Sequence, residues 1–321
     1  MSNNIEQVLL VGTGGMAREY IKVLDAVHVP YKIVGNTIES VKRFNEDTGK
    51  SAVAGGVEKY INLQQQVPRY AIVAVNGENL FWVTKTLIVT GVTRILVEKP
   101  GAVTTEQLIE LRKKAKEYNA KVFVAYNRRF YCSVRKLKEI VEKDGGIESI
   151  NFEFTEWQHV IEKTDHPDEI KQKWFLMNSS HVVDLVFYLA GNPKEIHSYK
   201  RGYLTWHKAG SIYAGCGITE KNVIFNYQAN WEAPGRWGIE VLTCKHRLYL
   251  RPLEKLQVQN IASVKIEDYP LDDKIDMQYK SGLFCEVKAL LNDTNLDVDL
   301  CSIDEQIEHM NIYSKISGEV Y

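Results

Sequence analysis

Up to residue 126, short apolar runs alternate with longer stretches whose apolar positions recur at helical spacing. The runs are apolar throughout, which is typical of strands buried on both faces of a sheet. Strand–helix–strand units of this length predict a doubly wound parallel sheet with right-handed crossovers. The predicted strands are 7–11, 31–35, 70–75, 94–97 and 122–126, and the predicted helices are 16–24, 39–46, 79–90 and 104–119.

The pattern changes after the last of these strands. A helix is predicted at 133–143, a turn follows at Asp144-Gly145-Gly146, and closely spaced strand-like runs then begin. Strands that need no helical crossover indicate a mixed or antiparallel sheet. These strands are 149–157, 195–204, 211–218, 222–231, 237–243 and 247–250, with helices at 181–190, 281–291 and 303–316. We therefore predict an α/β protein: a domain at 1–124 with the parallel sheet, and an α+β domain at 125–321 with a large mixed or antiparallel sheet.

Length and charge restrict the function classes. The 321 residues fit two domains of about 150 residues each. The net charge is −1 and no basic stripe is present, which argues against a nucleic-acid partner. No apolar stretch approaches the roughly 18–20 residues of a membrane span, and the start of the chain does not resemble a signal peptide.

Cysteine and histidine spacing argues against crosslinks and metal sites. The five cysteines are scattered and form no C-x-x-C pair, so free thiols in a reducing cytoplasm are predicted rather than disulfides. The histidines show no metal-ligand spacing, and we predict no metal.

A glycine-rich turn joins the first predicted strand to the first helix. Gly12-Thr13-Gly14-Gly15-Met16-Ala17 matches G-x-G-x-x-[GA], the dinucleotide-binding turn of Rossmann domains. Gly12 allows a tight turn, and Gly14 lets backbone amides approach a pyrophosphate at the helix N-terminus. The alternative is a purely structural turn. The predicted cofactor contacts are Gly12, Thr13, Gly14, Gly15, Met16, Asn36, Thr37, Val75, Asn76, Glu98 and Lys99.

The end of the second strand bears on the choice between NAD and NADP. An Asp or Glu there would hold the ribose 2′-hydroxyl of NAD, but this strand ends in Asn36 and Thr37. The missing carboxylate removes a repulsion that would exclude NADP, and Lys42 and Arg43 follow in the next helix. The pattern thus favours NADP; the alternative places those two cations on a solvated helix face.

The fifth strand runs into Glu98-Lys99-Pro100, where ligands bind in parallel sheets. With the glycine turn, Tyr126-Asn127-Arg128-Arg129-Phe130 and His181-Val182-Val183-Asp184, the chain resembles the glucose-fructose oxidoreductase / inositol dehydrogenase (Gfo/Idh/MocA) family. The resemblance implies a Rossmann domain followed by an α+β domain whose sheet lines the substrate site and often mediates oligomers, hence a homodimer or homotetramer. It also implies hydride transfer between a nicotinamide cofactor and a hydroxyl or keto carbon, commonly of a sugar. Lys99 and His181 correspond to the family's active-site lysine and histidine.

One position departs from the family pattern. Many members carry an Asp four residues before the histidine, where this chain has Met177. A thioether cannot ionise, so the acid is absent or is supplied by another residue such as Glu156 or Asp184. Further similarity to bacterial surface-polysaccharide enzymes implies a nucleotide-linked sugar. The substrate-binding residues predicted in this way are Tyr126, Asn127, Arg128, Glu156, Trp174, Asn178, His181 and Arg236.

Three functions remain open on this pattern. The first is an NAD(P)-dependent oxidoreductase acting on a sugar derivative, which Lys99 and His181 favour. The second keeps the fold but uses the cofactor transiently in lyase or glycosidase chemistry. The third is a regulator that senses NAD(P) or a sugar without turnover, which Met177 favours.

Overall fold

The computed structural model describes residues 7–63, 67–292 and 299–321, and it divides the chain into two compact units. The first unit comprises the chain up to Asn127 together with Asp276–Glu308, and the second comprises Arg128–Ile275 and His309–Tyr321. The sequence pattern predicted that the second domain would run from 125 to the end. The return of 276–308 to the first unit corrects that expectation.

Buried polar contacts explain this return. The side chain of Arg94, which lies in the sheet of the first unit, donates hydrogen bonds to the backbone carbonyls of Leu290 and Ala289. Gln306 donates to the carbonyl of Pro100 at 3.0 Å. A buried guanidinium requires such acceptors, and the hydrophobic pattern of a helix does not show which core it joins.

The first unit is built on a seven-stranded sheet with the order β15-β6-β5-β4-β1-β2-β3. β1 to β6 are parallel neighbours, and β15 adds an antiparallel edge. Every residue of β1 and β4 is buried, so the predicted doubly wound parallel sheet is confirmed. The strands are β1 (Val8–Val11), β2 (Tyr31–Gly35), β3 (Ala52–Ala54), β4 (Tyr70–Val73), β5 (Arg94–Glu98), β6 (Lys121–Ala125) and β15 (Cys301–Ser302).

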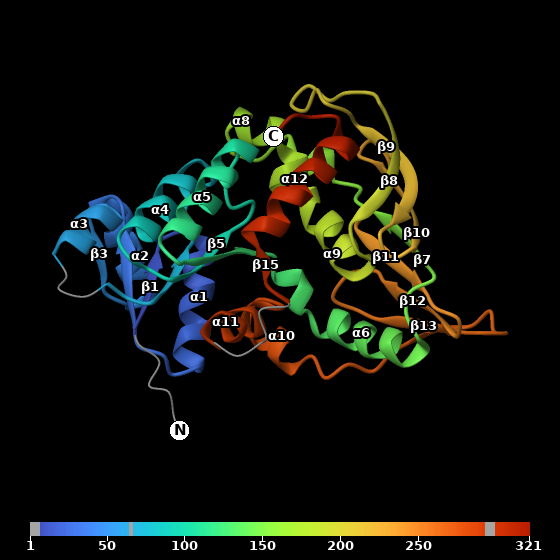
Figure 1. The fold of residues 1–321 in the computed structure, drawn as a ribbon, viewed down its shortest axis with the longest axis horizontal. Coiled ribbons are helices and arrows are strands. Elements are labelled where there is room, and N and C mark those ends of the chain that lie inside the picture. Colours follow the sequence, from blue (N-terminus) through green and yellow to red (C-terminus); the bar gives the residue numbers. More distant parts are fainter. Residues whose placement is uncertain (1–6, 64–66, 293–298) are drawn as a thin grey trace. The chain divides into compact units, whose positions relative to one another are not determined.

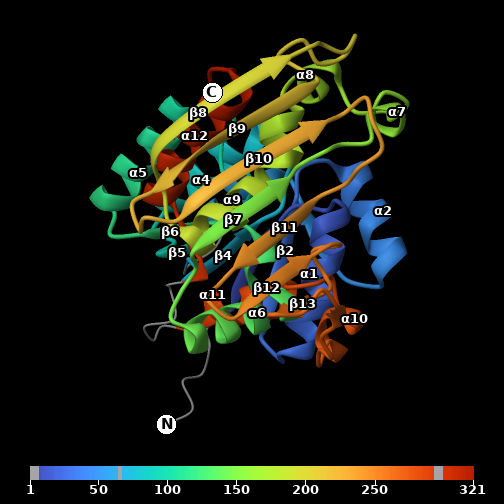
Figure 2. The same cartoon turned by 90° about the vertical axis from the view of Figure 1, so that its right-hand side faces the viewer.

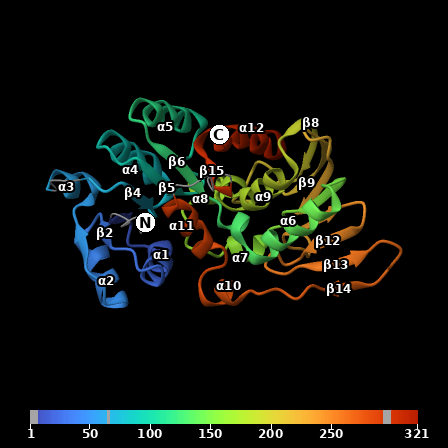
Figure 3. The same cartoon turned by 60° about the horizontal axis from the view of Figure 1, so that its bottom comes forward.

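Helices cover both faces of this sheet, with α1 on one side and α4 and α5 on the other (Figure 3). Gly91 adopts φ +100° just beyond α4, and Gly49 adopts φ +67° at the end of α2, as expected for left-handed cap residues. The helices are α1 (Gly15–Ala26), α2 (Ile38–Thr48), α3 (Gly56–Asn62), α4 (Gly77–Val89), α5 (Thr105–Glu117), α10 (Lys274–Gln278) and α11 (Leu283–Leu291). The pattern did not predict β3, α3 or β15, which are too short to show a period.

The second unit is built on an eight-stranded sheet with the order β14-β13-β12-β11-β7-β10-β9-β8, most of which faces the viewer in Figure 2. β7 and β10 are parallel and the other neighbours are antiparallel, so the predicted mixed sheet is confirmed. The strands are β7 (Ser149–Glu153), β8 (Pro193–Arg201), β9 (Ile212–Thr219), β10 (Ile224–Asn230), β11 (Gly238–Leu242), β12 (His246–Leu250), β13 (Gln257–Asn260) and β14 (Ile266–Asp268).

Helices pack on one face of this sheet, where α6 and α9 lie (Figure 1). Along β10 the residues alternate, with Phe225 and Tyr227 buried and Ile224 exposed, so the sheet has one covered face. The helices are η1 (Asn127–Phe130), α6 (Cys132–Asp144), α7 (Gln158–Ile161), α8 (Asp168–Gln172), η2 (Phe175–Ser179), α9 (Ser180–Ala190) and α12 (Ile303–Ser317), the last counted here from His309. Within the described residues, no helix is both long enough and apolar enough to cross a membrane.

Candidate functional site

The glycine turn after β1 contains one glycine that the fold itself requires. Gly12 has φ +128°, and a Cβ there would lie 2.1 Å from the carbonyl oxygen of Ala74, which follows β4. The Gly12 amide donates to the carbonyl of Val34 at 2.8 Å. The turn is therefore closed against the ends of both neighbouring strands, and no side chain fits.

Gly14 and Gly15 are different, because a Cβ on either would meet nothing within 4 Å. Gly14 has φ −86°, which any residue adopts, so the protein's own packing does not demand glycine there. The open space lies at the N-terminus of α1, where the amides of the first turn have no partner within the helix. A pyrophosphate fits such a space.

A cavity of about 510 Å³ extends from this turn along the carboxyl ends of β1, β2 and β4. Seven of the predicted cofactor contacts line it: Gly12, Thr13, Gly14, Asn36, Thr37, Val75 and Asn76. Gly15, Met16, Glu98 and Lys99 are not among its lining residues. Further lining residues were not predicted from the sequence. The turn at 55–58 was missed because β3 and α3 were not predicted, and Ser40, Asn79, Val83 and Thr86 were missed because they lie within helices.

The residues at the end of β2 that line the cavity, Asn36 and Thr37, carry no charge. The Thr37 hydroxyl accepts a hydrogen bond from the Ser40 amide at 3.2 Å and so caps α2. Lys42 and Arg43 are exposed and do not line the cavity, and Lys42 lies 4.0 Å from Glu46. The two cations thus occupy the solvated helix face that was the alternative interpretation.

The Glu98-Lys99-Pro100 segment is held by contacts within the first unit. The Tyr20 hydroxyl donates to Glu98 at 2.9 Å, and burial raises the pKa of Glu98 above its usual value. Lys99 is half-buried at the carboxyl end of β5. Lys99 therefore follows directly on the carboxyl end of β5, the edge at which ligands bind in such sheets.

Two predicted substrate residues, Tyr126 and Asn127, belong to the first unit. Tyr126 is buried, and Asn127 donates from its side-chain amide to the carbonyl of Ser281 at 2.9 Å. Met16, a predicted cofactor contact, also belongs to the first unit, where its sulfur accepts a hydrogen bond from the Lys280 ammonium at 3.2 Å.

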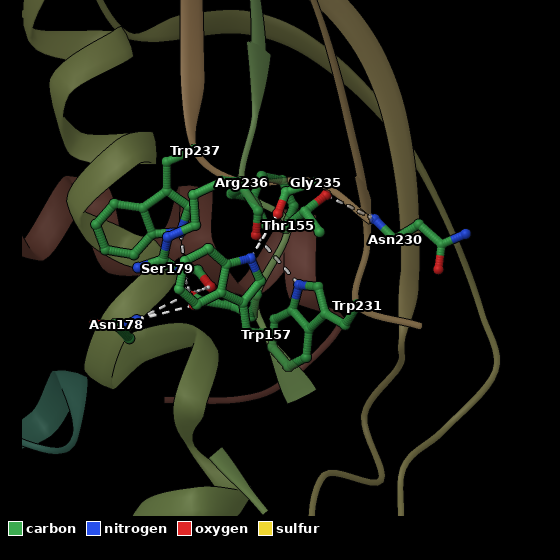
Figure 4. Close-up of polar contacts among 11 residues, drawn as sticks. Thr155, Trp157, Asn178, Ser179, Asn230, Trp231, Gly235, Arg236 and Trp237 are labelled. Carbon is green, nitrogen blue, oxygen red and sulfur yellow. Dashed lines mark hydrogen bonds and ion pairs between the residues drawn. The ribbon is translucent and has the colours of Figure 1, made fainter. Parts of the chain in front are cut away.

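Glu156, which follows β7, is buried at the centre of a hydrogen-bond cluster in the second unit. Figure 4 labels four of its partners: Asn178, Ser179, Arg236 and Trp237. The Glu156 carboxylate accepts from the Asn178 amide at 3.0 Å and the Ser179 hydroxyl at 2.8 Å. It also accepts from the Arg236 guanidinium at 2.9 Å and the Trp237 indole at 3.3 Å. Burial raises the pKa of Glu156, and the Arg236 charge and these donors offset part of that rise.

Guanidinium and indole groups alternate beside this cluster. Arg236 lies 4.9 Å from the ring centroid of Trp157 and 4.4 Å from that of Trp237, and Arg128 lies 4.7 Å from the Trp237 ring. The Trp157 indole is 48% exposed and donates to the carbonyl of Gly235 at 2.8 Å. Two cations and an exposed indole suit a ligand with an anionic group and a flat ring.

A π-helical turn, η2, precedes the α9 helix that begins next to His181. Such turns often occur at functional sites. η2 carries Met177, Asn178 and Ser179, and the last two bind Glu156. The His181 ring lies 6.2 Å from the Trp237 ring, so the structure brings together five of the predicted substrate residues: His181, Asn178, Glu156, Arg128 and Arg236. Trp174, at the start of η2, lies instead against Trp206 and His166.

Asp184 does not supply the missing acid. It is fully buried, and Arg129 holds it with hydrogen bonds of 2.6 and 2.9 Å. His309 approaches the same carboxylate at 3.2 Å. Although burial alone would raise it, the Arg129 charge lowers the pKa of Asp184. Of the two carboxyls considered as substitutes for an acid at 177, only Glu156 lies in the cluster beside His181.

Comparisons with known proteins bear on the first domain and on the fold. Residues 7–126 match the model of the Gfo/Idh/MocA oxidoreductase family, NAD-binding Rossmann fold. No curated protein matches the sequence.

Solved structures share the fold over nearly the whole chain. UDP-N-acetylglucosamine 3-dehydrogenase GnnA from Acidithiobacillus ferrooxidans is 14% identical with a TM-score of 0.77, covering 98% of this chain and 97% of its own. The WlbA dehydrogenase from Bordetella pertussis, solved with NADH and UDP-GlcNAcA, is 15% identical with a TM-score of 0.74, covering 98% and 95%. An oxidoreductase from Agrobacterium radiobacter, solved with NAD+, L-tartaric acid and magnesium, is 10% identical with a TM-score of 0.77, covering 99% and 95%. Residues 7–126 are thus similar to the NAD-binding Rossmann domain of the Gfo/Idh/MocA oxidoreductases, and the solved structures share the fold of the whole chain.

Proposed function

We propose that the protein is an NAD(P)-dependent dehydrogenase that transfers a hydride between the nicotinamide cofactor and a hydroxyl or keto carbon of a nucleotide-linked sugar. The observation that carries the cofactor assignment is the cavity at the glycine turn, which is open at Gly14 and Gly15. When bound, the nicotinamide ring accepts or donates the hydride. This chain's own residues must bind the two ligands and move the accompanying proton.

The second unit supports an anionic sugar derivative. Arg128 and Arg236 face the indole rings, and the exposed Trp157 offers a flat surface for a sugar or base. Glu156 neutralises one of the two cations, which leaves the cluster with a net positive charge for a phosphate or carboxylate. GnnA and WlbA, whose names and titles refer to UDP-linked sugars, share the fold.

Lys99 and His181 are the proposed proton-transfer and positioning groups. For Lys99, the half-buried position directly after β5 supports this role. For His181, the position beside the Glu156 cluster supports this role. The hydrogen bonds of Asn178 and Ser179 to Glu156 hold the π-helical turn η2 that precedes His181.

The open face of the second sheet supports assembly into a homodimer or homotetramer. Tyr199 is 75% exposed on β8 and Ile224 is 61% exposed on β10. A role in surface-polysaccharide synthesis and a cytoplasmic location remain predictions from the sequence.

Replacing Gly14 with leucine is expected to weaken NADH binding at least about tenfold, because the new side chain occupies the space for the pyrophosphate. The fold should survive, since a Cβ there meets nothing and φ is ordinary. Calorimetric titration with NADH checks this, with the unfolding temperature as a control. Unchanged affinity would show that the turn is structural.

The substrate class is tested by turnover. The purified protein with NAD+ or NADP+ is offered UDP-N-acetylglucosamine, its uronic acid, and the two free sugars, and the absorbance of reduced nicotinamide is followed. We expect turnover with a UDP-linked sugar and a much higher KM for the corresponding free sugar, because the free sugar lacks the diphosphate that Arg128 and Arg236 would bind. Binding of cofactor and sugar nucleotide without any net reduction would favour the sensor or transient-cofactor functions.

A further inference from the structure

The adenosine end of the cofactor cavity is formed by two segments that are apart in the sequence. One is the end of β2, with Asn36 and Thr37, which lies beside the adenosine ribose in doubly wound folds. The other is the turn from β3 into α3. The Gly55 amide donates to the carbonyl of Asn36 at 3.0 Å, and a Cβ on Gly56 would lie 3.4 Å from the Asn36 side-chain oxygen. The turn therefore lies directly against the tip of β2.

Glu58 follows this turn, in the first helical turn of α3, and lines the cavity. Among the described residues that line it, Glu58 is the only one with a charged side chain. Lys42 and Arg43 lie on the exposed face of α2 and do not line the cavity. Lys59 does not line it either, although its side chain lies over Gly55, with Nζ 3.5 Å from a Cβ built there. The fixed charge at this end of the cavity is therefore negative.

A carboxylate at this place distinguishes the two dinucleotides. It accepts a hydrogen bond from the ribose 2′-hydroxyl of NAD, and it repels the 2′-phosphate of NADP. Within the proposed cofactor-binding function, we infer that Glu58 holds the adenosine ribose and makes the protein select NAD over NADP. This inference replaces the preference for NADP, which depended on the missing acid at the end of β2. The acid comes instead from the following strand–helix unit.

The test compares dissociation constants of NADH and NADPH, measured by calorimetric titration. We expect wild type to bind NADH at least about tenfold more tightly than NADPH. Glu58→Gln should bring the two constants to within about threefold, mainly by strengthening NADPH binding, because the repulsion is removed. Glu39→Gln is the matched control, since Glu39 is exposed in the first turn of α2 but does not line the cavity. Its ratio should equal that of wild type.

Other outcomes separate this inference from the proposed function. A wild type that binds NADPH as tightly as NADH, or an unchanged ratio in Glu58→Gln, overturns the inference while leaving the dehydrogenase function intact. A loss of NADPH binding in Lys59→Gln also overturns it, because Lys59 would then be the group that faces the 2′-phosphate. Binding of neither dinucleotide by wild type overturns the proposed function, and the inference with it.

Discussion

Replacing Lys99 with alanine is expected to lower kcat by about 10²–10⁴, the usual contribution of a positioned acid or base. Oxidation of an alcohol requires a base that takes the hydroxyl proton as the hydride leaves, and reduction requires the matching acid. The affinity for NADH should remain close to that of wild type, because Lys99 does not line the described cavity at the glycine turn. Steady-state kinetics with the UDP-linked sugar and titration with NADH give the two values.

Two further variants separate proton transfer from simple charge. Lys99→Arg keeps the positive charge but cannot release a proton in the accessible pH range. If Lys99 transfers the proton, kcat stays low in this variant; if it only supplies charge, much of the activity returns. Lys32→Ala removes an exposed lysine of β2 in the same unit and should leave kcat unchanged. Full turnover in Lys99→Ala would exclude Lys99 as the acid or base.

Features that depend on neighbouring residues could be predicted from the sequence. The glycine turn is one, because the strand before it, the tight turn and the helix after it lie within about twenty residues. The structure confirms the parallel sheet around it, and it shows why Gly12 and Gly14 are glycine for different reasons. Glu98 is also placed correctly at the end of β5, although its partner Tyr20 could not be foreseen.

Features that depend on chain segments far apart could not be predicted. Glu58 reaches the cofactor cavity through a three-residue strand and a seven-residue helix, both too short to show a period. The donors to Glu156 include Arg236, 80 residues further along the chain. Asp184 was a candidate acid only because its partners, Arg129 and His309, are distant in sequence. In each case the chemistry of the side chain was evident and its partner was not.

The Arg129–Asp184 pair leads to the largest expected effect on stability. Both side chains are completely buried, so removing Arg129 takes the guanidinium partner from a buried carboxylate, with the His309 ring still 3.2 Å away. Arg129→Met should therefore reduce the free energy of unfolding by about 3–5 kcal/mol. Arg247→Met is the matched control in the same unit, because the side chain of Arg247 is 42% exposed and that of its partner Glu240 is 26% exposed. Its cost should be at most about 1 kcal/mol. Urea titration of both variants provides the comparison.

The pH dependence of the free energy of unfolding tests whether the Asp184 carboxylate, once it has lost the Arg129 charge, causes the destabilisation. In wild type Arg129 lowers the pKa of Asp184, so the pair's contribution is present above the unfolded value near about 3.9 and is lost only as the pH falls through the folded value. Without Arg129, burial raises the pKa of Asp184 instead. The Asp184 carboxyl of the Arg129→Met variant then takes up a proton as the pH falls from neutral, so the stability deficit of the variant shrinks towards acid pH.

Adding Asp184→Leu to Arg129→Met should recover part of the lost stability at neutral pH, because the buried charge is gone. A deficit that stays constant between pH 7 and pH 4 (roughly the range in which such a carboxyl titrates) would instead mean that lost packing against Tyr188, whose ring lies 4.6 Å from the Arg129 guanidinium, causes the destabilisation.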